Sequence, residues 1–435
     1  MPGISIGIMM SFMETKTTAL LIFITAYILF VFLPKKRTPI AVTGALLLVL
    51  LGVMSPLQAF FAINWNVMGI FVGTLIVADI FMESRVPAYI AEIIVAKAKN
   101  TAWAILLICA LAGFISAFVE NVATVLIVAP IALSLAKKLK INPINMMIAI
   151  ALSSNLQGVA TLIGDPPSML LGGFAKMTFW DFFFYQGRPS IFFAVELGAI
   201  TSFFVLYFIF RNYREKTTLV PVEKVCSWVP TILLVSLIIL LALSSFFDTG
   251  FSYAAGIICM VFGIIAILWE KFVNNGSIVE GIKSLDWETT LFLAGIFILV
   301  GGIILTGWIE VISGFLSGLI GENIFLGYTL VVFISVLLSA FIDNVPFLAA
   351  MLPVAVSMSN KLGINPSLFL FGLLIGTSLG GNITPIGASA NIVACGLLKK
   401  EGYEVKFTHF VKIGLPFTLA AVSASYLLVW FIWAK

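Results

Sequence analysis

Apolar segments, each long enough to cross a membrane as a helix, recur along the whole chain and are separated by short polar loops. A helix needs about 20 predominantly apolar residues to cross a hydrocarbon core of about 30 Å. The pattern predicts ten membrane-spanning helices, at 17–33, 39–55, 65–82, 146–172, 191–210, 228–246, 253–268, 289–305, 367–397 and 413–433. The predicted fold class is therefore an all-α, polytopic membrane protein.

Two further apolar segments are interrupted midway by polar residues. Glu120-Asn121-Val122 interrupt one of them, and Asp343-Asn344-Val345 interrupt the other. Polar groups in the middle of a bilayer are costly unless they line a cavity inside the protein. We therefore expect two re-entrant hairpins, over residues 101–138 and 325–361, whose tips meet near the middle of the membrane.

The sequence around the first hairpin returns around the second at a constant offset of 223 residues. We assign a first repeat to residues 1–215, with a broken helix at 145–173, and a second to residues 225–435, with a broken helix at 367–397. Each repeat contains five membrane-spanning helices and one hairpin. Because five is odd, the second copy is predicted to be inverted, and inverted repeats with broken helices are typical of secondary transporters.

Composition and charge exclude several other classes of protein. Only 10% of the 435 residues are charged, against about 25% in a soluble domain. Most Lys and Arg fall in loops that the predicted arrangement puts in the cytoplasm, which places both termini outside the cell (inner) membrane. The net charge of +4 therefore indicates orientation and not nucleic-acid binding. One histidine, His409, and four isolated cysteines give little for a metal or haem enzyme to use, so we expect no cofactor.

The hairpin tips and helix breaks carry the polar groups that would bind a solute or an ion. Gly and Pro open a helix, and the freed carbonyl oxygens ligate a cation while half-helix N-termini supply N–H donors. The alternative is that these residues serve only kinking and helix packing. The candidate binding residues are Glu120, Asn121, Val122, Ser154, Asn155, Thr161, Gly164, Asp165, Asp343, Asn344, Val345, Thr377, Ser378, Gly381, Asn382, Thr384, Gly387, Ser389 and Asn391.

Three carboxylates bear most on the chemistry. Glu120 and Asp343 occupy matching positions at the tips, and Asp165 follows the glycine of the first break. We expect no Lys or Arg near them, so Na⁺ or H⁺ is the natural partner of a charge that is costly at this depth. The alternative is that Glu120 and Asp343 only cap the helices that follow them. Na⁺ is expected at Asn121, Asp165, Asn344 and Gly387.

Two more acidic residues, Asp79 and Glu196, fall inside predicted helices, and their repeat counterparts are not acidic. Each is either a coupling residue or a locally satisfied polar group. Without a basic residue in the interior, neutral or cationic substrates fit best: Na⁺, H⁺, or an uncharged hydroxide such as As(OH)₃. An anion held only by helix N-termini is a further alternative.

The motifs Glu-Asn-Val with Thr-Leu-Ile-Gly-Asp-Pro-Pro, and Asp-Asn-Val-Pro with Gly-Gly-Asn-Ile-Thr-Pro-Ile-Gly-Ala-Ser-Ala-Asn, resemble those of the ion transporter superfamily. The chain is most similar to the branch of arsenite/antimonite permeases, NhaD-type sodium/proton antiporters and the P protein. Divalent anion/sodium symporters are more distant relatives, and their tips read Ser-Asn-Thr where this chain has Glu120 and Val122, or Asp343 and Val345. Gln157 and Ser168 depart from the usual Gly and Asn.

The resemblance implies a homodimer in the lipid bilayer, with a scaffold domain and a mobile transport domain, each drawn from both repeats. The transport domain would move as an elevator, and residues 86–98 would form a lateral arm helix joining the two domains. The expected function is a secondary active transporter that couples Na⁺ or H⁺ to movement of a small inorganic solute, with arsenite-like or oxyanion efflux first. Sodium/proton antiport and sodium-coupled uptake of citrate, a dicarboxylate or another anion are alternatives.

Two other classes of function remain as alternatives. An intramembrane aspartyl protease would use Asp79 and Asp165, but the chain lacks the first glycine of the Gly-x-Gly-Asp motif before Asp165, and this function does not account for the repeat. A passive channel would conduct without coupling, which the carboxylates at the tips argue against. We therefore expect a transporter and not an enzyme.

Overall fold

The computed structural model describes residues 2–139, 141–215, 223–273 and 278–434. Within them the chain is mostly helical, with one short β-hairpin that pairs Phe184–Tyr185 (β1) with Arg188–Pro189 (β2). The helices of the first half are α1 (Pro2–Phe32), η1 (Pro34–Lys36), α2 (Arg37–Leu50), α3 (Pro56–Ala62), α4 (Trp65–Glu83), α5 (Val86–Ala96), α6 (Thr101–Ser116), α7 (Asn121–Leu139), α8 (Ile144–Gly158), α9 (Pro166–Ala175), η2 (Trp180–Phe182) and α10 (Ile191–Phe210). Those of the second half are α11 (Val229–Ser244), α12 (Ala254–Val273), α13 (Ile278–Ser284), α14 (Trp287–Leu305), α15 (Trp308–Ile320), α16 (Ile324–Ser339), α17 (Asn344–Leu362), α18 (Pro366–Gly380), η3 (Gly381–Ile383), α19 (Ser389–Lys400) and α20 (Phe407–Trp433).

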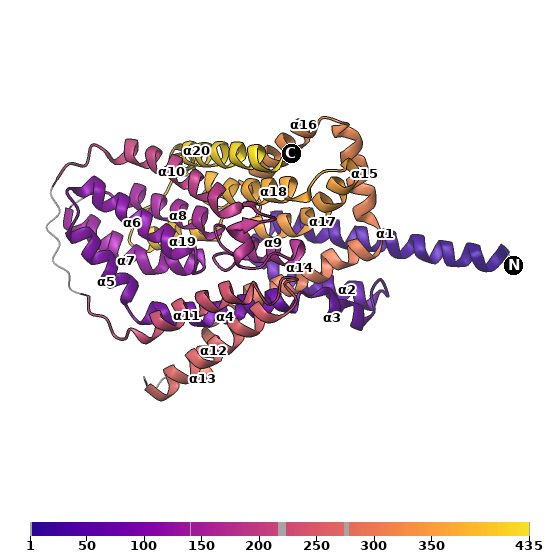
Figure 1. Ribbon diagram of the computed structural model, residues 1–435, viewed down its shortest axis with the longest axis horizontal. Helices are drawn as coiled ribbons and strands as arrows, with labels where there is room; N and C mark the ends of the chain where they lie inside the picture. The colour runs from indigo at the N-terminus through magenta and orange to yellow at the C-terminus, as the bar shows by residue number, and fades with distance from the viewer. Residues whose placement is uncertain (1, 140, 216–222, 274–277, 435) are drawn as a thin grey trace.

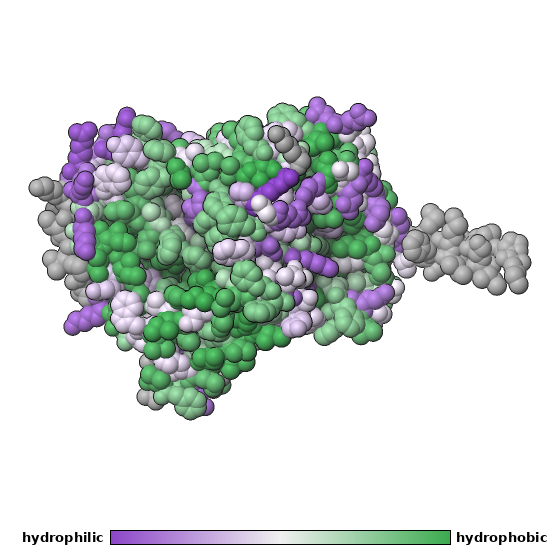
Figure 2. Space-filling model, in the orientation of Figure 1, coloured by the Kyte–Doolittle hydropathy of each residue, from purple (hydrophilic) through white to green (hydrophobic). Residues whose placement is uncertain are grey.

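The helices have the length and surface of a protein that crosses a membrane several times. Among the described residues, nine are long and apolar enough to span a bilayer, or ten if the bent pair α15–α16 counts as one span. Figure 2 shows broad hydrophobic areas on the visible face, with hydrophilic side chains gathered toward both ends of the long axis and in a group near the middle. The chain is therefore a multi-pass membrane protein.

Matching helices recur at the predicted offset. The two halves contain α6 and α16 of 16 residues, α7 and α17 of 19 residues, and α4 and α14 of 19 residues. α7 and α17 are long enough to cross a bilayer by themselves, so the re-entrant path of the hairpins and the inverted orientation of the second half stay predictions.

The sequence pattern located most elements but missed several shorter ones. The segment expected at 39–55 is shorter than predicted, since α2 ends at Leu50. The separate helix α3, which was not predicted, follows at Pro56, because Ser55 and Gln58 form a capping box that starts a new helix. The expected arm at 86–98 is helix α5, and its unpredicted counterpart α15 lies at 119° to α16. Helix α13 and the β1–β2 hairpin were also not predicted.

Two helix pairs connect the halves of the chain. In one, Gly69 and Gly73 of α4 lie against Gly256 and Cys259 of α12. In the other, α2 lies against α14, with Thr38 Oγ1 donating to Glu288 O at 2.9 Å and Ala41 contacting Gly295. Figure 1 shows α4 and α12 together along one side, and α2 near α14 on the side of the N-terminus. Each pair joins a helix from one half to a helix from the other, so the core of each half is completed by helices of the other half.

Candidate functional site

Each hairpin tip is a short non-helical turn whose acidic side chain caps the helix that follows. Glu120 Oε2 accepts a hydrogen bond from Ala123 N at 3.0 Å at the start of α7. Asp343 Oδ1 accepts from Val345 N at 3.0 Å at the start of α17. Capping satisfies N–H groups that lack a partner inside the helix. The capping role considered for both residues is thus confirmed, and one further oxygen of each carboxylate is left for another partner.

The two helix breaks are built on the same backbone contacts. Thr161 Oγ1 donates to Ala117 O in the first break, and Thr384 Oγ1 donates to Ala340 O in the second. A Cβ atom on Gly164 would lie 2.5–2.8 Å from the carbonyl oxygens of Gly158, Ser116 and Ala117.

A Cβ atom on Gly387 would lie 2.6–3.0 Å from the carbonyl oxygens of Gly381, Ser339 and Ala340. Only glycine permits this approach of break and hairpin at either position. The close contact holds the end of each hairpin's first helix against the break.

A chain of buried amides links the first tip, the first break and the second break. Asn121 Nδ2 donates to Asn155 Oδ1 at 3.1 Å. Asn155 Nδ2 donates in turn to Ser378 O at 2.9 Å and to Asn382 Oδ1 at 3.0 Å. Asn382 Nδ2 donates a hydrogen bond back to Leu152 O of the first half at 3.2 Å. Asn155 therefore joins the halves at the centre of the site.

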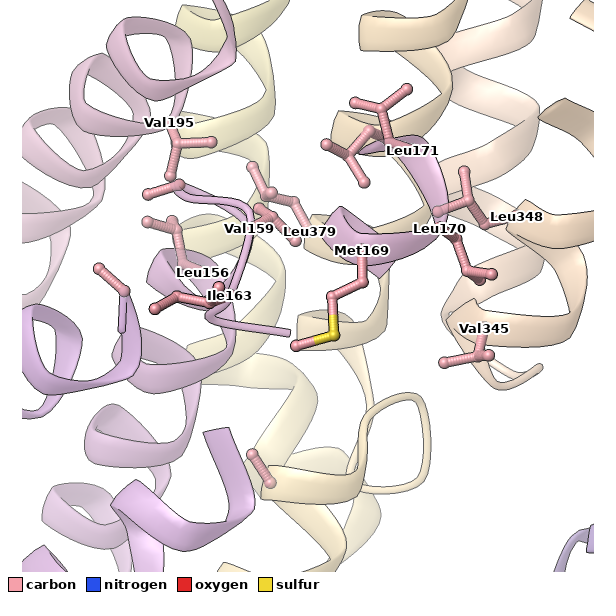
Figure 3. Close-up of a cluster of buried hydrophobic side chains, with 14 of the residues drawn as sticks. Leu156, Val159, Ile163, Met169, Leu170, Leu171, Val195, Val345, Leu348 and Leu379 are labelled. Atoms are coloured by element: carbon pink, nitrogen blue, oxygen red, sulfur yellow. The ribbon is translucent and has the colours of Figure 1, made fainter. Parts of the chain in front are cut away.

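Apolar side chains hold the first break in place. Figure 3 shows Leu156, Val159 and Ile163 gathered with Val195 on one side of the broken segment, and Leu170 of α9 extending toward Val345 and Leu348 of α17. Val159 and Leu170 are fully buried. The polar groups of the break are therefore held in position by buried, closely packed apolar side chains.

Between the tips lies a cavity of about 120 Å³. It brings together both tips, both breaks and helices α4 and α14. Its lining residues are Arg37, Phe71, Leu75, Glu120, Asn121, Val122, Asn155, Asp165, Pro166, Asp286, Thr289, Phe292, Asn344, Val345 and Ser389. Eight of these were predicted from the sequence, from four segments far apart in the chain.

Arg37 overturns the expectation that no basic side chain comes near the tips. Its guanidinium pairs with Asp343 Oδ2, donates to Thr289 Oγ1 at 3.3 Å and lies 5.0 Å from the ring centroid of Phe292. The physical reason is that α1 ends at Phe32 and α2 begins at Arg37, so the turn between them comes to the second tip. Tyr27 of α1 donates to Pro346 O at 2.7 Å beside the same tip.

Acidic groups still exceed basic ones at the cavity. Glu120, Asp165 and Asp286 line it together with Arg37, whose charge is paired with Asp343. Asp286 caps α14, accepting from Thr289 N at 2.9 Å. Within the described residues, Glu120 forms no ion pair. The first tip is therefore the anionic side of the site.

Several buried oxygens at the site have no hydrogen-bond donor among the described residues. They include Asn121 Oδ1, Asp165 Oδ2, Ser378 Oγ and Asn391 Oδ1. Buried acceptors are normally satisfied, and those that are not call for an ion, a water or a ligand. This set of carboxylate and amide oxygens is the kind that binds a hard cation. No cluster of three His, Cys, Asp or Glu side chains able to hold a metal occurs in the described part of the chain.

The other predicted site residues support the cavity without lining it. Asp343 pairs with Arg37, Ser154 Oγ donates to Asn121 O at 3.0 Å, and Asn391 Nδ2 donates to Gly381 O and Thr384 O at 3.0 Å. Thr377 O accepts from Ser339 Oγ. Neither Asp79, on α4, nor Glu196, which lines a separate cavity, lines this one.

The functional residues that the sequence reasoning missed come from the walls of the cavity: Arg37, Phe71, Leu75, Asp286, Thr289 and Phe292. The repeat contained a signal for Asp286. It immediately precedes Trp287, as Asn64 precedes Trp65, and both residues cap the helix that follows.

The chain is similar along nearly its full length to membrane transporters. It is 28% identical to an uncharacterized transporter of Mycobacterium tuberculosis over 95% of this chain and 98% of the relative. It is 26% identical to the human P protein, over 96% of this chain and 60% of that protein.

Solved transporters share the fold. The YdaH transporter of Alcanivorax borkumensis matches with a TM-score of 0.58 and 15% identity, over 89% of this chain and 88% of that one. MtrF of Neisseria gonorrhoeae, described as illuminating a class of antimetabolite efflux pumps, matches with a TM-score of 0.57 and 15% identity, over 89% and 84%.

A family model described as a citrate transporter, CitMHS, matches residues 27–365 and 337–435. The resemblance to the ion transporter superfamily is thereby confirmed, and with it the expectation of a transporter instead of an enzyme. The chain belongs to the citrate transporter (CitMHS) family.

Proposed function

We propose that this secondary transporter exchanges Na⁺ for H⁺, and that the cation binds at the first hairpin tip. The observation that carries the proposal is the contrast between the tips: Arg37 forms an ion pair with Asp343, whereas Glu120 forms no ion pair among the described residues. A carboxylate this deep in a membrane protein needs a proton or a cation. Glu120 is therefore the group at which Na⁺ and H⁺ compete.

The surroundings of Glu120 support a small cation. The cavity is small, about 120 Å³, and Asp165, 4% exposed, adds a second carboxylate to its lining. Asn121 Oδ1 adds an uncharged acceptor with no donor of its own in the described structure. Carboxylate and amide oxygens together suit Na⁺, and either carboxylate can take up a proton when the ion leaves.

The same proposal includes a mechanism of alternating access. The hairpins and broken helices would move as one body, since the contacts at Gly164 and Gly387 fix each hairpin to its break. Helices α2, α4 and α14 would form the static wall that carries Arg37 and Asp286. The inverted repeat and a homodimer held by the static helices belong to this proposal.

The experiment is a pH-gradient assay in everted membrane vesicles energised by respiration, with NaCl, LiCl and KCl added in turn. We expect Na⁺ or Li⁺ to collapse the gradient, and Glu120→Gln to abolish the response while the protein remains folded. Glu401→Gln, an exposed acid at the end of α19, is the matched control and should behave as the parent. A Glu120→Gln protein that exchanges normally would reduce Glu120 to a capping group.

A second candidate is efflux of an arsenite-like hydroxide or an oxyanion, and one observation favours it. Arg37 gives the cavity a positive group beside Thr289 and Ser389, which could orient an oxyanion or a neutral hydroxide. Flux of arsenite, and then of citrate, into proteoliposomes tests this alternative. The citrate in the family's name makes citrate the anion to test, although the cavity is small for a tricarboxylate.

A further inference from the structure

A second and larger cavity, of about 410 Å³, lies between helices α6, α8 and α10. It shares no lining residue with the cavity between the tips. Glu196 of α10 and Gln157 of α8 are among its polar lining residues, and much of the rest of its wall is aromatic. The proposed ion exchange uses Glu120 and Asp165, and neither of them lines this space.

In the wall of this cavity the first half departs from the second at one helix–helix contact. In the second half, Gly380 of α18 lies directly against Val336 of α16, since a Cβ atom on Gly380 would be 2.6 Å from Val336 O. At the matching positions of the first half, the small residue is Gly113 of α6 and the large one is Gln157 of α8. A Cβ atom on Gly113 would meet Gln157 Cγ at 3.0 Å. The exchange brings a polar amide into a contact that is apolar in the other half.

The cavity opens toward the lipid. Phe114 of α6 and Phe204 and Ile200 of α10 line it and are 68%, 59% and 55% exposed. Exposed aromatic and aliphatic side chains on membrane helices face acyl chains. A ligand can therefore enter sideways from the bilayer without passing through the ion site.

The carboxylate and the amide oxygen of the cavity have no cation beside them among the described residues, although the Gln157 amide group donates a hydrogen bond to Glu196. Gln157 Oε1 is buried without a hydrogen-bond partner in the described structure. Glu196 forms no ion pair among the described residues, and no Lys or Arg lines the cavity. Phe192, Phe203 and Phe417 supply ring faces in the same space. A carboxylate together with aromatic faces is the combination that recognises an ammonium group.

We propose that this cavity is a binding site for an amphipathic organic ammonium that enters from the membrane. Its charged nitrogen lies at Glu196 and donates to Gln157 Oε1, and its hydrocarbon chain lies among the phenylalanine rings toward the opening. An uncharged lipid tail would fill the apolar part but would leave the Glu196 carboxylate without a cation and Gln157 Oε1 without a donor.

The test uses the full-length protein in phosphatidylcholine nanodiscs and two probes with the same diazirine-bearing chain, dodecylammonium and dodecanol. After photolysis, we expect the ammonium to label peptides of α6 and α10, and the alcohol to label them at least about tenfold less at equal membrane concentration. Glu196→Gln should weaken ammonium labelling by about tenfold or more, whereas Glu401→Gln should leave it unchanged.

A second variant separates loss of the ligand from loss of the fold. The pair Gly113→Val with Gln157→Gly copies the contact of the second half and removes the amide acceptor, so it should weaken ammonium labelling by about tenfold while the protein stays monodisperse. Equal labelling by ammonium and alcohol, with no effect of Glu196→Gln, would show a lipid groove and overturn the proposal. Labelling of the parent protein elsewhere would overturn it as well.

Discussion

The two hairpins hold their tips in the same way, with Glu120 Oε2 and Asp343 Oδ1 each 3.0 Å from a backbone N–H of the next helix. They differ in what surrounds the tip. Arg37 reaches only the second acid, so the second tip is paired and the first is not. The two halves thus share the same backbone contacts at their tips, and they differ in the side chains that surround those tips.

The breaks show the same division. Asn155 in the first half makes hydrogen bonds across to the second, while its counterpart Ser378 offers only its backbone carbonyl. Asn391 ties the second break together through two hydrogen bonds, while its counterpart Ser168 has no partner for its hydroxyl among the described residues. At these matched positions, Asn155 of the first half bonds to the other half, whereas Asn391 of the second half bonds only within its own break.

Replacing the glycine shared by both breaks should have the largest effect. Gly164→Ala or Gly387→Ala would put a methyl group within 3.0 Å of three carbonyl oxygens. We expect an overpacking cost of about 1–3 kcal/mol or more and loss of transport in proteoliposomes. Gly396→Ala, in α19 with nothing within 4 Å, is the control. Substantial transport by either variant would mean that the hairpins need not lie so close to the breaks.

Next in size is the loss of the amide that joins the halves. Asn155→Ala removes hydrogen bonds to Ser378 and Asn382 and leaves the buried Asn121 Nδ2 without its acceptor. We expect the free energy of unfolding to fall by about 2–3 kcal/mol, measured as a lower thermal midpoint in detergent. Ser378→Ala, at the matching position, should change it by less than about 0.5 kcal/mol. If Asn155→Ala and Ser378→Ala lowered the free energy of unfolding equally, Asn155 would not be the residue that holds the two halves together.

The ion pair of the second tip should give a smaller, coupled effect. Arg37→Gln and Asp343→Asn each break the pair, so the double variant should be less impaired than the sum of the two, with a coupling of about 1 kcal/mol in thermal stability. Arg37→Gln combined with Glu120→Gln should show a weaker coupling, because Arg37 lines the same cavity as Glu120 but forms its ion pair with Asp343. Equal coupling to both acids would mean that Arg37 serves the two tips alike.

The smallest effect is a gain, obtained by making the first break resemble the second. Ser168→Asn places an amide where Asn391 has one, able to donate to Gly158 O and Thr161 O as Asn391 donates to Gly381 O and Thr384 O. We expect an increase of about 0.5–1 kcal/mol in unfolding free energy, seen as a higher thermal midpoint. A decrease would show that the first break is too tightly packed for the longer side chain.

The repeat made much of the site predictable. Because both halves carry an acid-Asn-Val tip and a glycine-containing break, the sequence located Glu120, Asn155, Asp165 and Asn344, which line one cavity. The apolar segments likewise located most of the long helices, because the thickness of the bilayer sets the length of a helix that spans it.

Arg37 was not predictable because its position depends on tertiary structure. It ends the run Lys35-Lys36-Arg37, which in sequence resembles an exposed cytoplasmic loop. Only the packing of α1 and α2 against α14 and the second tip brings its guanidinium to Asp343. The wall residues Phe71 and Phe292 were missed for a similar reason, since apolar residues on a membrane helix do not reveal which of them face a cavity.

The pairing of α2 with α14 has a consequence for how the protein is made. α2 is only 14 residues long and contacts α14, which begins about 240 residues later in the chain. At a synthesis rate of about 5–20 residues per second, α2 waits roughly 12–50 s for its partner to leave the ribosome. During that interval Arg37 and Thr38 lack the partners they have in the finished protein, so the nascent first half is the stage at which chaperones and quality-control proteases have access to it.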